Sequence, residues 1–157
     1  MTGISTNHDG KATLDIIAFT LGQQSFCIET TSVREIRGWA LSTPMPHSSP
    51  EVLGVINLRG TVIPTIDLSR KLGMAAGITS ERSAIVVVEV FGKPIGLQVE
   101  QVTDMISVTI DQLQPTPDLI SSFERSYCEG VITHQSGMIC FLNLQRMFAE
   151  GLEELAA

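Results

Sequence analysis

Short apolar stretches alternate with turn residues along most of the chain, and this pattern is typical of strands joined by tight hairpins. Residues 83–91 form the most apolar segment, which indicates a strand at the centre of a sheet. Four hairpins are predicted, and they join residues 15–21 to 25–29, 54–58 to 61–66, 83–91 to 95–100 and 130–134 to 138–143. The pattern therefore predicts an all-β protein.

Helical signals are short by comparison. Residues 32–35 have the spacing of a capping box, and residues 67–72 are long enough for one or two turns. Residues 144–155 have the amphipathic pattern of a closing C-terminal helix, which Gly151 weakens. We expect these helices to accompany the sheets without forming a layer of their own.

An internal repeat gives the strongest indication of architecture. The segment GVINLRGTVIPTIDLSRKL from Gly54 aligns without gaps with GVITHQSGMICFLNLQRMF from Gly130, at an offset of 130 − 54 = 76 residues. Upstream, residues 26–35 resemble residues 95–104 at an offset of 69. Each half therefore carries the same order of hairpin, short helix or turn, loop and hairpin.

Two similar modules predict two small sheets, and a sheet of that size usually closes on itself to remove its edges. We expect two small β-barrels packed side by side. The predicted divisions are a polar tail without fixed structure over residues 1–14, a first lobe over 15–80 and a second lobe over 81–157. The boundary is soft, because a terminal strand or helix could cross between the lobes.

Composition narrows the class of partner. The chain has 157 residues and is 43% hydrophobic and 17% charged, which suits one folded unit and excludes a wholly disordered chain. Its formal net charge is −7, and its pI is about 4.8. Because such a surface repels a phosphate backbone, nucleic acid is not an expected partner.

Cysteine usage and hydropathy predict a cytoplasmic protein. Cys27, Cys128 and Cys140 are an odd number without a C-x-x-C pair, and we expect reduced thiols buried as small apolar side chains. No purely apolar run is longer than that of residues 84–88, whereas about 18 to 20 residues are needed to cross a bilayer. Residues 1–11 lack the apolar body of a secretion signal, so no direct membrane insertion is expected.

No catalytic constellation emerges from the residues. Phosphate-binding, dinucleotide-binding, zinc-protease and serine-hydrolase motifs are absent from the sequence. His8, His47 and His134 are too scattered to suggest a metal cluster, while Asp67 and Glu89 are better explained by helix capping and an outward position. We therefore predict no enzyme, no cofactor and no metal. A small hydrolase or ligand-binding barrel is the alternative, and it would require a deep pocket with convergent polar groups.

With catalysis set aside, we expect a protein-binding role, because two barrels that meet edge to edge leave a groove and free strand edges for a partner. Val33, Ile36, Val99 and Val102 occupy corresponding places in the two halves. They either offer an apolar strip at this groove or belong to the core.

The run GVINLRGTVIPTIDL, with VREIRGW before it and VTDMISVTIDQLQPTPDL after it, resembles the chemotaxis coupling protein CheW family over about residues 15–148. The resemblance implies two SH3-like five-stranded β-barrels packed side by side, with short helices and a C-terminal helix. It also implies a non-catalytic adaptor that couples chemoreceptor tips to the histidine kinase CheA.

The resemblance carries over particular partner-binding residues. It implicates the segment with Val33, Glu35 and Arg37, and the turn with Asn57, Arg59 and Gly60, in contacts with receptor or kinase. We expect the strongest effect from Arg59, because a planar guanidinium at a turn can bind in a bidentate manner. A second contact is implied for the loop over residues 114–119. Gln114 and Leu119 there replace an expected basic and an expected aromatic residue, which predicts a weaker or altered contact in kinase–adaptor rings.

The partners implied in this way are the cytoplasmic tip of a methyl-accepting chemotaxis protein, the regulatory domain of CheA, and other copies of the adaptor in rings. These contacts would recruit the chain to receptor arrays at the inner membrane. A CheW-like scaffold of a non-motility chemosensory pathway, controlling pili or development, stays open as an alternative.

Overall fold

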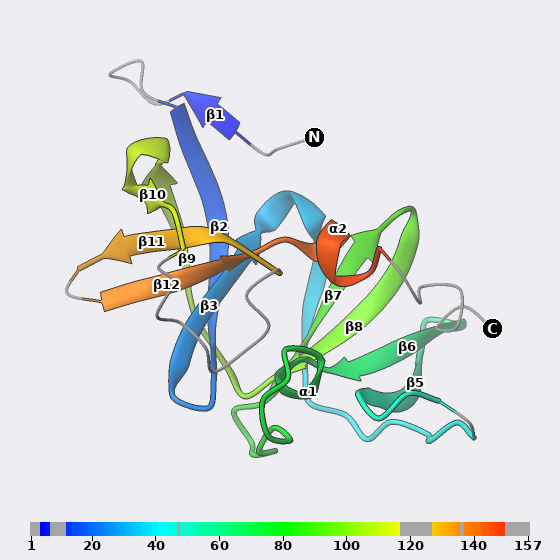
Figure 1. Ribbon diagram of the computed structural model, residues 1–157. Helices are drawn as coiled ribbons and strands as arrows, with labels where there is room; N and C mark the ends of the chain where they lie inside the picture. Colours follow the sequence, from blue (N-terminus) through cyan, green and yellow to red (C-terminus); the bar gives the residue numbers. More distant parts are fainter. Residues whose placement is uncertain (1–3, 7–11, 47, 117–126, 136, 150–157) are drawn as a thin grey trace.

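The computed structural model describes residues 4–6, 12–46, 48–116, 127–135 and 137–149. This part of the chain is mostly β, with two sheets and a few short helices, as the sequence predicts (Figure 1). The strands are β1 (Ile4–Thr6), β2 (Ala12–Leu21), β3 (Gln24–Glu29), β4 (Val33–Gly38), β5 (Val52–Leu58), β6 (Thr61–Asp67), β7 (Ala84–Val90), β8 (Lys93–Val99), β9 (Gln101–Thr109), β10 (Leu113–Gln114), β11 (Cys128–His134) and β12 (Gly137–Leu142). The helices are α1 (Leu68–Lys71) and α2 (Leu144–Met147), with single 3-10 turns η1 (Thr30–Ser32) and η2 (Ile110–Gln112).

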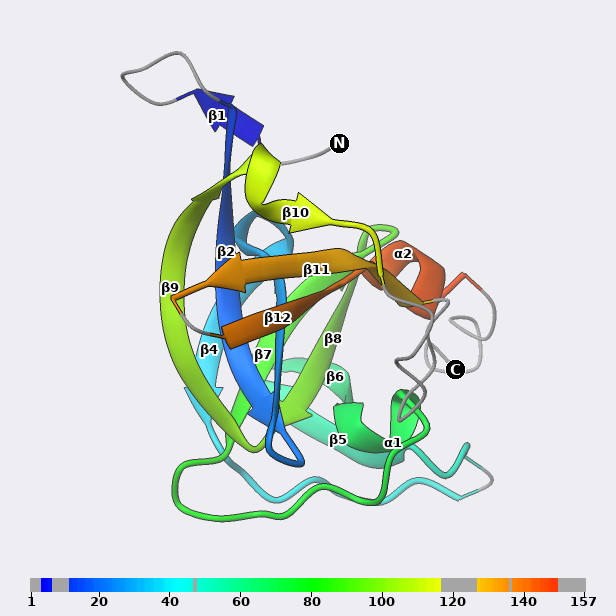
Figure 2. The ribbon, with the colours of Figure 1, turned by 60° about the vertical axis from the view of Figure 1, so that its left-hand side comes forward.

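Two sheets organise these strands. Sheet A has the order β1-β2-β3-β12-β11-β10, and β9 pairs with the other side of β2. Sheet B has the order β4-β7-β8-β6-β5. Figure 2 shows β9 running beside β2, with β11 and β12 crossing in front of β3. Most neighbouring strands are antiparallel, whereas the pairs β12–β3 and β6–β8 are parallel.

The two parallel pairs reveal the internal repeat in three dimensions. Thr65 of β6 lies opposite Gly96 of β8, and Phe141 of β12 lies opposite Cys27 of β3. These pairs are equivalent, because 141 − 65 = 76 and 96 − 27 = 69 are the two offsets of the repeated segments. The halves of the chain are thus related by an approximate twofold symmetry.

The two sheets do not divide the chain at residues 80 and 81, because elements of each half cross to the other sheet. Sheet B consists of residues 33–99, while sheet A combines strands before residue 30 with strands after residue 100. Each half contributes its first hairpin to one sheet and its last three long strands to the other. Both arrangements use the same repeated strands, so the repeat alone does not distinguish them.

The predicted polar tail is also shorter than expected. β1 pairs with the start of β2, with Ile4 opposite Leu14 and Thr6 opposite Ala12. Backbone hydrogen bonds supply this pairing and require no apolar run, which explains why hydrophobic periodicity did not indicate it.

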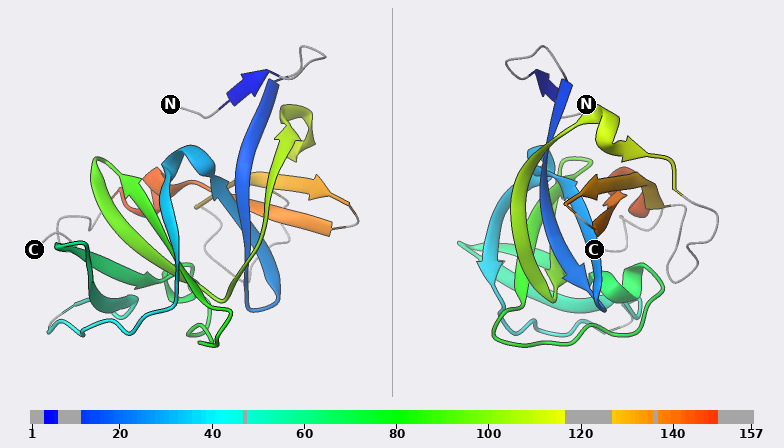
Figure 3. Two further views of the ribbon diagram at one scale, coloured as in Figure 1. Left: turned by 180° about the vertical axis from the view of Figure 1, so that it is seen from behind. Right: turned by 90° about the vertical axis from the view of Figure 1, so that its left-hand side faces the viewer.

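Three apolar clusters form the core of the part of the chain that the structure describes. One lies between the sheets and includes Phe19 and Phe26 of sheet A with Val86 and Leu97 of sheet B. The other two belong to sheet A alone and sheet B alone. Each sheet therefore curves around a cluster of its own, as the prediction of two barrels requires. The view from behind in Figure 3 shows β7 and β8 of sheet B behind β4.

The strand β7 explains why residues 83–91 are so apolar. Val86 and Val88 enter the cluster between the sheets, whereas Ile85 and Val87 enter the cluster of sheet B. Since side chains alternate along a strand, both faces of β7 must be apolar.

The two α-helices begin at equivalent caps. Asp67 accepts a hydrogen bond from Ser69 N at 3.1 Å, and Asn143 accepts one from Arg146 N at 3.0 Å. The predicted C-terminal helix is helical over Leu144–Met147, and residues 150–157 lie outside the described residues. The predicted helix over residues 32–35 is wrong, because η1 ends at Ser32 and β4 begins at Val33.

We expect Asp67→Ala to lower the free energy of unfolding by about 2 kcal/mol, since it removes a helix cap and leaves a buried donor without its acceptor. Asp67 is only 5% exposed and also accepts from Gly77 N at 3.0 Å. Urea denaturation measures the change. Asn143→Ala is the control, because Asn143 caps the equivalent helix and donates to Glu129 at 2.7 Å but, among the described residues, accepts from no connecting segment, so its loss should be smaller. Equal losses would contradict a structural role for the Gly77 bond.

Candidate functional site

The turn between β5 and β6 presents the predicted arginine. Leu58 pairs with Thr61, which leaves Arg59 and Gly60 as a two-residue turn. Both have positive φ, 51° and 88°, as a type I′ hairpin requires. Asn57 Oδ1 accepts a hydrogen bond from Gly60 N at 2.8 Å and so fixes the turn. Arg59 projects from it with a side chain that is 71% exposed.

Arg59 forms a forked contact with Glu35 of β4. Its Nη2 lies 2.5 Å from Glu35 Oε2, and its Nη1 lies 3.4 Å from Glu35 Oε1. Arg37 Nη1 approaches Glu35 Oε1 at 3.6 Å. The hydrogen bond from Arg59 is the main reason that the pKa of Glu35 lies below its ordinary value. Two guanidinium groups thus share one carboxylate, and the cluster carries a net positive charge on an acidic chain.

The cluster also closes sheet B. Glu35 belongs to β4, and Arg59 directly follows β5; these are the two outermost strands of the sheet. Their ion pair therefore spans the seam between strands that share no ladder of hydrogen bonds. We call Glu35, Arg37 and Arg59 the seam cluster.

The register of β4 assigns the predicted residues to two faces. Glu35 and Arg37 pair with Val87 and Ile85, which point into the cluster of sheet B. Val33 and Ile36 pair instead with Val88 and Val86, which point into the cluster between the sheets. Val33 is half-buried against that cluster, while Ile36 is 38% exposed. The strand thus offers a charged face and an apolar face.

The remaining predicted residues are dispersed. Val99 is 2% exposed in the cluster between the sheets, so of the two alternatives that the sequence left open it takes the core and is no surface contact. It shares one face of β8 with the buried residues Ile95 and Leu97, and an inward side chain cannot contact a partner. Val102 on β9 is half-buried and occupies the position equivalent to Val33. Gln114 is exposed on β10 of sheet A, and Leu119 lies outside the described residues.

Sequence reasoning missed several features. Trp39 and Val62 are exposed apolar side chains, one following β4 and the other directly after Thr61. The thiols of Cys128 and Cys140 also meet, and a hydrogen bond from Cys140 is the main cause that lowers the pKa of Cys128 to about 6. Both cysteines lie on the hairpin β11–β12, and this was the available signal. The bulge between Cys128 and Gly130 shifts the register of that hairpin, so the sequence alone did not reveal the contact.

The described residues contain neither a side-chain cluster that could hold a metal ion nor a helix that could span a membrane. Within them, no group of three or more His, Cys, Asp or Glu side chains could hold a metal ion. No helix found in the same residues has the length and apolar character to span a membrane.

The Glu35 carboxyl should titrate at a lower pH in the native protein than in the Arg59→Ala variant, because the variant lacks the donor that stabilises the carboxylate. Since folding lowers this pKa, the ion pair stabilises the fold above the unfolded-state pKa, and its contribution is lost as pH falls through the folded-state pKa. NMR titration of the Glu35 side-chain carboxyl measures both midpoints. Arg34→Ala, which breaks the separate pair with Glu89, should leave the Glu35 midpoint unchanged. Equal midpoints in native protein and Arg59→Ala would contradict the coupling.

A two-sheet protein with a charged seam and an adjoining exposed apolar face has the surface of a protein-binding module, since Arg and Trp are enriched in interfaces. Comparison with known proteins identifies the family to which this module belongs. Residues 15–151 match the CheW-like domain family. The chain is 46% identical over 142 residues to the chemotaxis protein CheW of Rhizobium meliloti (strain 1021), covering 90% of this chain and 92% of that protein.

More distant relatives agree. The chemotaxis protein CheW of Klebsiella aerogenes is 29% identical over 143 residues, covering 90% of this chain and 84% of that protein. The crystal structure of the scaffolding protein TtCheW from Thermoanaerobacter tengcongensis superposes with a TM-score of 0.80 at 28% identity, covering 87% of this chain and 93% of that one. The chain belongs to the CheW-like family.

Proposed function

We propose that this protein is a non-catalytic adaptor of a chemosensory array, which binds the cytoplasmic tip of a chemoreceptor and the regulatory domain of the kinase CheA at the same time. Membership of the CheW-like family supports a scaffolding role in chemotaxis. The observation that carries the proposal is the seam cluster, because a highly exposed Arg59 is held in one orientation by Glu35. A pre-oriented guanidinium loses little freedom when it binds a partner.

An adaptor must bind two partners on separate surfaces, so that neither excludes the other. We assign the seam cluster to the kinase, since its net positive charge suits an acidic surface. We assign the apolar face of β4, with Val33 and Ile36, to the receptor tip. Simultaneous binding would recruit the chain to receptor arrays at the inner membrane. Gln114, exposed on β10, is assigned to contacts with the kinase or with further adaptor copies in a ring.

A charge on the apolar face should weaken receptor binding. We expect Val33→Asp and Ile36→Asp each to reduce affinity for a receptor-tip fragment by at least about tenfold, because a desolvated carboxylate opposes an apolar contact. Affinity for the CheA regulatory domain should change little. Isothermal titration against each fragment measures both values, and thermal unfolding checks that the variants are folded.

Ile36→Asp keeps this test interpretable, since Ile36 is more exposed than Val33 and its replacement should disturb the core less. Met138→Asp is the control, because Met138 is exposed on β12, away from β4. Unchanged receptor affinity in both β4 variants would overturn the assignment of this face.

A further inference from the structure

Two of the three cysteines lie on one face of the hairpin β11–β12. Cys128 belongs to the apolar cluster between the sheets, and Cys140 packs against the same cluster. Cys128 pairs with Leu142, which lies two residues after Cys140 on β12, so the two thiols are diagonal neighbours across the hairpin. A hydrogen bond joins them. Cys27 instead lies fully buried in the cluster of sheet A, where burial raises the pKa of its thiol.

The sulfur of Cys128 has two hydrogen-bond donors beside it. Thr116 Oγ1 donates to it at 3.3 Å, and the Cys140 thiol donates as well. When Cys128 is protonated, its own thiol donates to Gly130 O at 3.1 Å. The hydrogen bond from Cys140 is the main reason that the pKa of Cys128 lies below its ordinary value, and the same bond raises the pKa of Cys140. Cys128 is therefore the thiol of the pair that ionises first.

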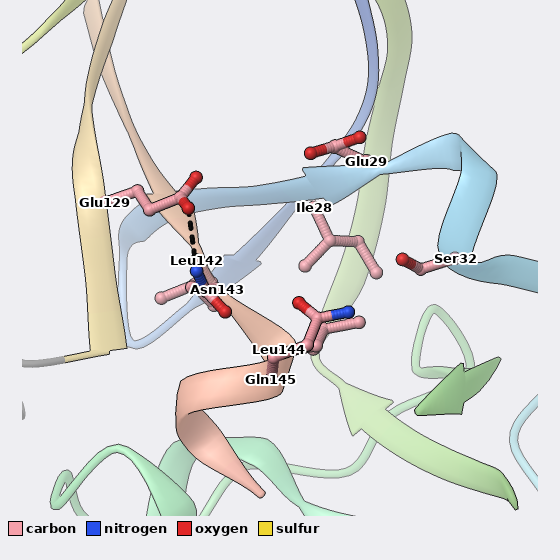
Figure 4. A pocket seen from close by; sticks show the side chains of 8 residues that line it. All are labelled: Ile28, Glu29, Ser32, Glu129, Leu142, Asn143, Leu144 and Gln145. Carbon is pink, nitrogen blue, oxygen red and sulfur yellow. Dashed lines mark hydrogen bonds between the residues drawn. The ribbon is translucent and has the colours of Figure 1, made fainter. Parts of the chain in front are cut away.

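A pocket of about 300 Å³ borders the residues around Cys128 (Figure 4). It opens where the end of β3, η1, the hairpin β11–β12 and the start of α2 meet, and Asn143 is part of its wall. Glu129, which follows Cys128, and Leu142, which pairs with Cys128, also line it. Cys128 itself is 5% exposed, and Cys140 is partly exposed. A small uncharged oxidant can thus approach the pair, whereas a bulky one is excluded from Cys128.

We propose that Cys128 and Cys140 are a modification site, at which hydrogen peroxide joins them in an intramolecular disulfide across the hairpin β11–β12. The Cys128 thiolate attacks one peroxide oxygen, the O–O bond breaks, and Cys128 becomes a sulfenic acid. The hydroxide that leaves takes up the proton that Cys128 released and becomes water.

The second step forms the disulfide. The Cys140 sulfur attacks the sulfenic sulfur of Cys128, and the hydroxyl group leaves as water with the proton of Cys140. The two thiols together lose two electrons, and one peroxide molecule is reduced to two waters. This modification does not depend on the proposed adaptor role.

The test treats the full 157-residue chain with hydrogen peroxide, blocks free thiols with iodoacetamide and maps the peptides by mass spectrometry without reduction. Digestion after glutamate separates the two cysteines, because Glu129 lies between them. We expect a linked peptide that joins Cys128 to Cys140, a free Cys27 and a monomeric chain on a non-reducing gel. This link should form at least about tenfold faster than either link to Cys27, because its two thiols are already in contact.

Cys27→Ala is the matched control, and the disulfide should form in this variant at the native rate. In Cys140→Ser the second thiol is missing, so dimedone should trap a sulfenic acid on Cys128. Cooperative thermal unfolding shows whether each variant is folded. The link in the native chain is the decisive reading, and it needs no variant.

Three results would overturn the proposal. One is a disulfide that includes Cys27, and another is a disulfide-linked dimer as the main product. The third is a chain whose three thiols all remain free at a peroxide concentration that fully oxidises glutathione in the same buffer.

Discussion

Arg59→Glu is expected to weaken binding of the CheA regulatory domain by at least about tenfold while the protein remains folded. In the native protein the Arg59 guanidinium lies 2.5 Å from the Glu35 carboxylate. The variant replaces this guanidinium with a second carboxylate. It therefore both reverses the charge offered to the kinase and releases the side chain from its fixed orientation. Isothermal titration measures the affinity, and a cooperative thermal transition demonstrates the fold.

The double variant Glu35→Arg/Arg59→Glu separates these two effects. It restores an ion pair across the seam of sheet B but exchanges the positions of the charges. If the kinase recognises the guanidinium at the turn, the double variant should bind as weakly as Arg59→Glu. Full recovery of binding would show that the pair acts only by closing the sheet. Native affinity in Arg59→Glu itself would remove Arg59 from the interface.

Gly54→Ala should cause the largest loss of stability among single methyl additions, about 3 kcal/mol or more, with a fall in Tm of about 10 °C. Gly54 has φ of 145°, and a Cβ there would lie 2.1 Å from the carbonyl oxygen of Thr43. The backbone cannot easily withdraw, because Thr43 and Val55 exchange two hydrogen bonds of 2.9 Å. Differential scanning calorimetry measures the shift.

Gly38→Ala provides the matched control within sheet B. Gly38 lies at the end of β4, and a Cβ added there would meet no atom within 4 Å. Its Tm should remain close to that of the native protein. A Tm for Gly54→Ala within about 2 °C of the native value would contradict the close approach of the Thr43 segment.

Much of the fold was accessible from the sequence because its signals are local. Alternating apolar residues predict the four hairpins, and turn residues such as Arg59–Gly60 indicate where the chain reverses direction. The repeat gave the symmetry of the two halves. The exchange of hairpins between the sheets was missed, because the parallel pairs β6–β8 and β12–β3 join segments that are far apart in sequence. No local pattern states which of two equivalent partners a strand will choose.

The candidate site, like the fold, could be predicted from the sequence only in part. Glu35, Arg37 and Arg59 were expected in contact regions, and the structure brings their side chains together. Val99 lies on the same face of β8 as the buried residues Ile95 and Leu97, so the spacing in the sequence already favoured the core alternative for it. The pocket beside Asn143 was beyond sequence reasoning, since it exists only where strands of both halves meet after the exchange.

The proposed adaptor role requires one chain to hold receptor and kinase together on separate surfaces. Sedimentation velocity of the purified chain with a chemoreceptor-tip fragment and the CheA regulatory domain tests it directly. We predict a ternary complex that sediments faster than either pair and that disappears when the chain is left out. Two binary complexes that displace one another, with no faster species at saturating concentrations, would contradict the account.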